Sequence, residues 1–263
     1  MAKGKRWTRD ELLIALNLYH KLTFGQMHAR QPAIIAVADK MRRGVNSLAL
    51  KLVNFASLDP ALKMRGIKGM SGASALDRLV WLEFHSNLTD AAPASEIAFR
   101  ALLGADETDE IYVVPKGGVR VRKSQIGPTE IMATVKVRRG QEYFRQAVLN
   151  NFGGQCGVTG LAVRELLIAS HILPWGKHEA ERLNVRNGIC LSRLHDAAFD
   201  SYLISFDENL RLVLSSRLKE ALPQRTVQEN FAAYSGELLQ VPKDAALPDE
   251  KFLAVHRSIT FKK

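Results

Sequence analysis

The chain has 263 residues, of which 46% are hydrophobic, and this length and composition suit a folded protein with one large or two modest domains. Its 37 Lys and Arg residues outnumber its 27 Asp and Glu residues, giving a formal net charge of +10, and such a surface favours polyanions such as nucleic acids. No apolar run reaches the roughly 20 residues that span a membrane, and the basic N-terminus lacks an apolar signal core. The sequence therefore predicts a cytoplasmic protein without a membrane span.

Residues 1–104 have the pattern of a helical, basic domain that we expect to bind DNA. Thr8 and Glu11 form a capping box ahead of an apolar stripe, and Pro32 suits the first turn of a second helix. Ser74 is a good start for a later helix, and Ser95 is a plausible cap for the last one, which ends before a glycine.

A tight basic turn, residues 42–47, joins two of these predicted helices. Two short helices joined in this way are typical of helix-turn-helix and winged DNA readers, and Arg42 and Arg43 would then contact DNA. The alternative is a small helical bundle with a solvated charged face. The sequence leaves both open.

Residues 105–138 are predicted to be a basic linker that forms an extended arm along DNA phosphates. An Ile-Gly-Pro break interrupts any regular element there, and Arg138 and Arg139 add positive charge just before the next domain. A plain solvated linker is the alternative.

Residues 139–263 are predicted to form a second domain, organised around three residues. His171 closes a short apolar strand, and Asn187 sits in a turn that leads into a second apolar strand. His195 follows where the pattern changes to a helix. The local order is strand, loop, strand, helix. The only two cysteines, Cys156 and Cys190, cannot fill a four-ligand zinc site, and we expect both to be small buried residues.

The motifs S-H-I-L-P-W, R-N-G-I-C-L and L-H-D-A-A-F-D around these residues resemble the HNH, or ββα-metal, endonuclease family, in the type found in bacterial restriction-like proteins. The resemblance implies an α+β fold in which a helical N-terminal domain precedes a C-terminal ββα-metal nuclease module. It also implies that His171 is the general base, that Asn187 orients it, and that His195 binds one divalent metal. Imidazole is the side chain best suited to take a proton from water near pH 7.

Ser170 and Asp200 are the residues expected to complete the metal site beside His195. Many family members have an acidic residue or a histidine just before the first histidine, where this chain has Ser170. A hydroxyl group is a poor ligand for Mg²⁺, so a carboxylate is expected to complete the site, with Asp200 or Asp196 nearest. His178 and Glu179 are further alternatives.

The loop between His171 and Asn187 carries basic residues that could clamp phosphates, namely Lys177, Arg182 and Arg186.

The predicted function is a metal-dependent DNA endonuclease that uses Mg²⁺, or alternatively Mn²⁺ or Ni²⁺. Its expected substrate is double-stranded DNA, including modified DNA. By resemblance its role is restriction or defence, and a double-strand cut then predicts a homodimer. The main alternative is an HNH scaffold that binds DNA but no longer cuts it.

Overall fold

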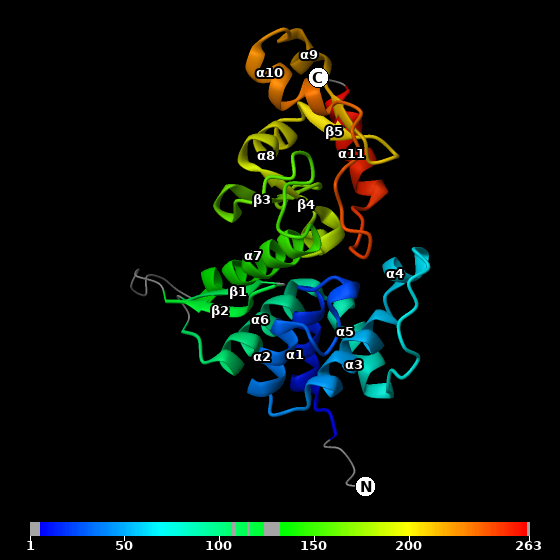
Figure 1. Cartoon of the computed structure of the whole chain (residues 1–263), viewed down its shortest axis with the longest axis vertical. Coiled ribbons are helices and arrows are strands. Elements are labelled where there is room, and N and C mark those ends of the chain that lie inside the picture. The colour runs from blue at the N-terminus through cyan, green and yellow to red at the C-terminus, as the bar shows by residue number, and fades with distance from the viewer. Residues whose placement is uncertain (1–5, 107–108, 115, 124–131, 262–263) are drawn as a thin grey trace. The chain divides into compact units, whose positions relative to one another are not determined.

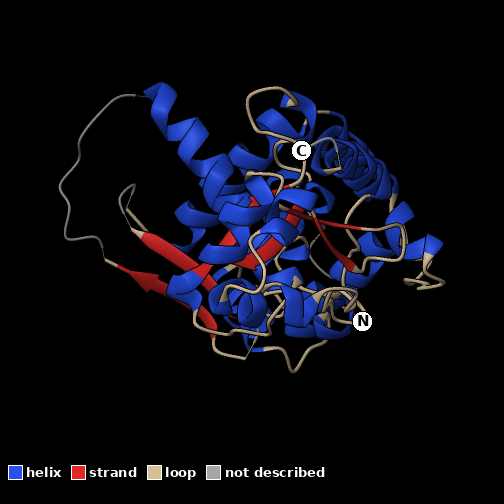
Figure 2. Cartoon of the chain, turned by 90° about the horizontal axis from the view of Figure 1, so that it is seen from above, coloured by secondary structure: helices blue, strands red, loops and turns tan. Residues whose placement is uncertain are grey.

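The computed structural model describes residues 6–106, 109–114, 116–123 and 132–261, and of residues 132–137 it describes the backbone alone. The chain divides into two compact units, Met1–Asn150 and Asn151–Lys263 (Figure 1). This division falls later in the chain than residue 139, where the sequence places the start of the second domain. Helices dominate, and the strands are short (Figure 2). The α+β class predicted from the sequence is confirmed.

The first unit is built from helices and one hairpin. Its elements are α1 (Arg9–Tyr19), the 3₁₀ turn η1 (Phe24–Gln26), α2 (Pro32–Lys40), α3 (Val45–Ala56), α4 (Pro60–Met64), α5 (Ala75–Ser86), α6 (Leu88–Leu103), β1 (Glu110–Val114), β2 (Gly118–Arg122) and α7 (Met132–Asn151). Helix α1 packs against α3, α5 and α6, so it forms the centre of this unit. Within the described residues, no helix is both long and apolar enough to cross a membrane.

The predicted starts of the first helices are confirmed, and that of α6 is wrong. Thr8 and Glu11 form a complete capping box on α1, Pro32 opens α2, and Ser74 caps α5. Helix α6 begins at Leu88, seven residues before the expected cap at Ser95. The Ser95 side chain is buried inside the helix, where its hydroxyl donates to the Ala92 carbonyl oxygen. A serine inside a helix can donate its hydroxyl group to a carbonyl oxygen of the preceding turn, so a serine in the sequence does not always mark the start of a helix.

A fully buried ion pair joins the turn that follows α1 to α6. Lys21 Nζ lies 2.5 Å from Glu96 Oε2, both side chains have zero exposure, and the ammonium group also lies 4.6 Å from the centre of the Phe99 ring. Asn17 donates a further hydrogen bond to Glu96. Replacing one partner would leave a buried charge unpaired, which costs about 3–5 kcal/mol.

The segment expected to be an extended arm contains an antiparallel hairpin in its described part. Strands β1 and β2 pair from Glu110↔Arg122 to Val114↔Gly118, and β2 packs on α2. Gln146 and Asn150 of α7 bond the backbone of β1, and Asn150 also donates to the Lys21 carbonyl oxygen. These bonds hold the C-terminal half of α7 in the first unit. Residues 124–131 lie outside the described residues, and residues 132–138, which were also expected to belong to the arm, form the start of α7 instead.

The second unit contains short strands, each paired with one antiparallel partner. Its elements are η2 (Arg164–Leu166), β3 (Leu167–His171), η3 (Glu179–Glu181), η4 (Val185–Asn187), β4 (Gly188–Ser192), α8 (Arg193–Asp200), β5 (Ile204–Phe206), β6 (Leu212–Leu214), α9 (Ser216–Glu220), α10 (Arg225–Asn230), η5 (Ala232–Tyr234) and α11 (Glu250–Thr260). Strands β3 and β4 pair from Leu167↔Ser192 to His171↔Gly188, and α8 packs on both strands. Cys156 and Cys190 are buried and unbridged, as predicted.

Candidate active site

His171 lies at the end of β3, in a pocket of about 400 Å³ that we call the His171 pocket. Four other polar or aromatic residues that line it come from three parts of the unit: Ser170 from β3, Trp175 from the following loop, and Asp196 and Asp200 from α8. Tyr202 and His256 complete one wall. The pocket therefore brings a histidine and two carboxyl groups to one cavity.

The His171 ring is held in one tautomer by the backbone. Its Nε2 atom lies 2.9 Å from the Arg182 carbonyl oxygen, and a carbonyl oxygen can only accept, so Nε2 carries the proton. Nδ1 is then the basic nitrogen of the ring. Burial lowers the pKa of His171 and the bond to Arg182 opposes this shift. The imidazole is therefore neutral near pH 7, as a general base must be.

Asn187 fixes the loop that supplies this carbonyl group. The side chain is fully buried. Its Oδ1 accepts from the Leu173 amide at 2.8 Å, and its Nδ2 donates to the Glu181 carbonyl oxygen at 3.1 Å, one residue before Arg182. Both ends of the loop are thereby tied to one amide. This geometry supports the orienting role predicted for Asn187.

The Arg182 guanidinium packs along the same loop. Its Nε donates to the Trp175 carbonyl oxygen at 2.6 Å, and its Cζ lies 5.3 Å from the centre of the Trp175 ring. The Trp175 ring in turn meets His171 edge-on, with centroids 5.3 Å apart. Arg182 thus helps to hold the wall of the His171 pocket.

Asp196 and Asp200 lie four residues apart on α8, so they share one face of the helix. Burial raises the pKa of Asp196, and the neighbouring Ser170 hydroxyl and Arg193 oppose this shift. Burial and the charge of Asp196 both raise the pKa of Asp200. The two carboxyl groups therefore repel each other when both are ionised, and a cation between them would relieve that repulsion.

The Ser170 hydroxyl group lies beside this carboxyl pair. It is buried, and its interaction with Asp196 lowers the pKa of that carboxyl group. In the described part of the chain, no cluster of three or more His, Cys, Asp or Glu side chains could hold a metal. Mg²⁺, however, is commonly held by one or two carboxylates together with substrate phosphate and water. Asp196 and Asp200 fit such a site, and Ser170 lies beside them.

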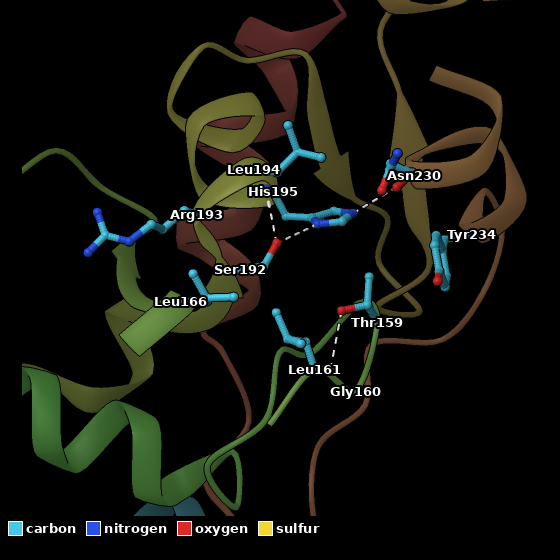
Figure 3. Close-up of a pocket in the computed structure, with 10 residues that line it drawn as sticks. All are labelled: Thr159, Gly160, Leu161, Leu166, Ser192, Arg193, Leu194, His195, Asn230 and Tyr234. Atoms are coloured by element: carbon cyan, nitrogen blue, oxygen red, sulfur yellow. Dashed lines mark hydrogen bonds between the residues drawn. The ribbon is translucent and has the colours of Figure 1, made fainter. Parts of the chain in front are cut away.

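His195 does not join His171, contrary to the expectation from the sequence. Its buried ring lines a different cavity of about 600 Å³, which we call the His195 pocket (Figure 3). Nε2 donates to the Asn230 carbonyl oxygen and Nδ1 accepts from the Ser192 hydroxyl, each at 2.8 Å. Burial lowers the pKa of His195, so the ring is neutral. Both ring nitrogens are used, and neither is left to bind a metal in this arrangement.

The physical reason is the geometry of the first turn of α8. Ser192 caps the helix by accepting from the His195 amide at 3.3 Å, and the same hydroxyl group holds the His195 ring. One residue along an α-helix turns the side chain by about 100°, so Asp196 faces away from the side that carries His195. Asp200 is five residues from His195 but four from Asp196, so it shares the helix face of Asp196.

The predicted phosphate-binding residues have different surroundings. Lys177, Arg42 and Arg138 are exposed, and Arg186 pairs with Asp249 at 3.0 Å while keeping 31% of its side chain exposed. Arg43 and Arg139 are buried in ion pairs with Glu11 and Glu142. A guanidinium in a buried pair cannot reach a phosphate without breaking that pair, so these two residues serve the fold.

Trp175, Tyr202 and His256 line the His171 pocket but were not assigned to the site from the sequence, and Asp196 was named there only as an alternative to Asp200. The i, i+4 spacing of Asp196 and Asp200 is a signal that could have found the carboxylate pair. The sequence gives no comparable signal for Trp175 or Tyr202. Their positions in the pocket depend on the tertiary arrangement of the loop after β3 and of the C-terminal end of α8. His178 does not line the pocket.

Comparison with known families gives one match. Residues 156–207 match the family model described as HNH endonuclease, and this segment contains β3, β4, α8 and β5. His171, Asn187, Asp196 and Asp200 all lie inside it. No curated protein matches the chain.

Proposed function

We propose that this chain, which carries an HNH endonuclease domain at residues 156–207, is a metal-dependent nuclease that hydrolyses phosphodiester bonds in DNA. The observation that carries the proposal is the His171 pocket. It combines a histidine that is neutral at pH 7, with its tautomer fixed by Arg182, and a pair of carboxyl groups on one face of α8.

In this mechanism His171 takes a proton from the attacking water at Nδ1, while Nε2 keeps its proton and its bond to the Arg182 carbonyl oxygen. Asn187 keeps that carbonyl group in place by tying down both ends of the loop. Asp196 and Asp200 would hold one divalent cation, with Ser170 beside them. Such a cation supplies charge stabilisation at the phosphate and the leaving oxygen.

The positive charge of the chain supports a nucleic-acid substrate. We propose double-stranded DNA, because the first unit offers the exposed Arg42 in the turn between α2 and α3. One active site cuts one strand, so a double-strand cut would need two copies acting together. A role in restriction is part of this proposal and rests on the resemblance alone.

The test is nicking of supercoiled plasmid in Mg²⁺, Mn²⁺ or Ni²⁺, on unmodified DNA and on DNA with modified cytosines. We expect His171→Ala to reduce the nicking rate by roughly 10²- to 10⁴-fold, the usual contribution of a general base. Chelation with EDTA should abolish nicking. His28→Ala, which changes an exposed histidine in the first unit, is the control and should retain the rate.

Binding of DNA without any nicking by the unaltered protein would contradict the proposal and favour an inactive HNH scaffold. Nicking that survives His171→Ala would place the active site elsewhere. Cleavage of structured RNA in preference to plasmid would change the substrate class.

A further inference from the structure

Tyr202 occupies a backbone position that usually belongs to glycine. Helix α8 ends in two bonds of the Schellman type: the Tyr202 amide donates to the Phe199 carbonyl oxygen and the Leu203 amide to the Ala198 carbonyl oxygen, each at 2.8 Å. The residue between these bonds must adopt the left-handed conformation, and Tyr202 does so with φ of 58°. A tyrosine there costs roughly 1–2 kcal/mol relative to glycine.

The turn itself gives no reason for a tyrosine, because both of its hydrogen bonds use backbone atoms alone. The side chain must therefore be explained by what it contacts. Tyr202 lines the His171 pocket, and its ring lies 4.7 Å from the centre of the His256 ring. His256 is fixed in turn by stacking on Phe199 at 3.8 Å and by bonds to Ser205 and to the Phe199 carbonyl oxygen. The phenol thus stands against a rigid wall of the cavity.

The acidic lining of the His171 pocket indicates which chemical group Tyr202 could supply to a substrate. Among the described residues that line it, none is lysine or arginine, while Asp196 and Asp200 are both acidic. A phosphate group entering the pocket therefore needs hydrogen-bond donors that are not cationic side chains. Tyr202 carries one such donor, and a hydrogen bond to a charged group contributes about 1.5–3 kcal/mol.

We propose that Tyr202 is a substrate-binding residue whose phenol hydroxyl donates a hydrogen bond to a phosphate oxygen of the nucleic-acid strand in the His171 pocket. This inference rests on the proposed function. It accounts for the strained position of a bulky residue at the end of α8, because strain is kept where the local geometry serves a site.

The competing explanation is packing. In that case the Tyr202 ring stabilises the second unit by covering His256, and its hydroxyl has no part in substrate binding. Tyr202→Phe separates the two explanations, because it keeps the ring and the packing and removes only the donor. Tyr202→Gly relieves the backbone strain and removes the whole side chain.

The experiment measures three quantities for each variant: the thermal midpoint of unfolding, kcat and KM for plasmid nicking, and Kd for a short DNA duplex in EDTA. We expect Tyr202→Phe to keep the thermal midpoint while kcat/KM falls roughly tenfold or more and Kd rises. Tyr202→Gly should lose at least as much kcat/KM. Leu210→Gly is the matched control, since Leu210 has φ of 60° in the turn between β5 and β6 and does not line the pocket.

Wild-type kcat/KM and Kd in Tyr202→Phe would overturn the inference and leave packing as the role of the ring. A fall of kcat/KM in Leu210→Gly equal to that in Tyr202→Gly would also overturn it, because backbone change alone would then explain the loss. If the unaltered protein binds duplex but never nicks it, the proposed function fails. The Tyr202→Phe effect on Kd then decides the inference by itself.

Discussion

Two histidines of the HNH domain, the part-buried His171 and the buried His195, differ in their surroundings. His171 gives one nitrogen to a backbone carbonyl group and lies in a cavity with Asp196 and Asp200. His195 has both nitrogens in hydrogen bonds, to Ser192 and Asn230, inside a larger cavity. Burial lowers the pKa of both. A neutral histidine is therefore not enough for chemistry, and the neighbouring carboxyl groups make the difference.

The largest effect expected from this comparison concerns the carboxyl pair. Asp196→Asn and Asp200→Asn should each lower the nicking rate by roughly 100-fold or more, because each removes a negative charge that would hold the cation. The measurement is the nicking rate as a function of Mg²⁺ concentration, which should shift to higher concentrations. Glu208→Gln, in the exposed turn between β5 and β6, is the control. Unchanged Mg²⁺ dependence in both Asp variants would remove them from the metal site.

The second expected effect is a loss of folding stability when His195 is replaced. His195→Ala should lower the free energy of unfolding by about 2–3 kcal/mol, because the Asn230 carbonyl oxygen and the Ser192 hydroxyl lose their partner in a buried place. Below its unfolding midpoint the variant should nick with unaltered Mg²⁺ dependence. Chemical denaturation and a Mg²⁺ titration check this, with Lys219→Ala, an exposed residue of α9, for comparison. Loss of metal binding at full stability would restore His195 as a ligand.

The smallest effect is the pH dependence of cleavage. A histidine is a base only when neutral, and burial lowers the pKa of His171 below its ordinary value of 6.5. The neutral fraction, and with it kcat/KM, should rise with pH through an acidic limb whose midpoint lies below 6.5. At pH 6 the rate should exceed about a quarter of its plateau, the neutral fraction of an unperturbed imidazole. A midpoint at or above 6.5 would contradict the burial of His171.

Much of the frame could be predicted from local signals. Caps and prolines placed the starts of α1, α2 and α5, because these signals act within a single turn of helix. The order of β3, β4 and α8 followed from short apolar runs and from the family motif, and this order located His171 and Asn187. The prediction that Ser95 caps α6 was wrong. Its hydroxyl group donates to the Ala92 carbonyl oxygen and accepts a hydrogen bond from the Asn17 side chain of α1. The contact with Asn17 is long-range and cannot be predicted from the local sequence.

The sequence by itself determined which residues could do chemistry, since His171, Asn187, Asp196 and Asp200 follow one another in a short and specific segment. Only the tertiary structure decided which of them meet. His195 is held by the carbonyl group of Asn230, 35 residues away, while the i, i+4 geometry of α8 turns both carboxyl groups toward His171. Arg43 likewise forms a long-range ion pair with Glu11, whereas Arg139 pairs with Glu142 one turn away on α7. Periodicity fixes the faces of a helix, and long-range packing decides which cavity each face meets.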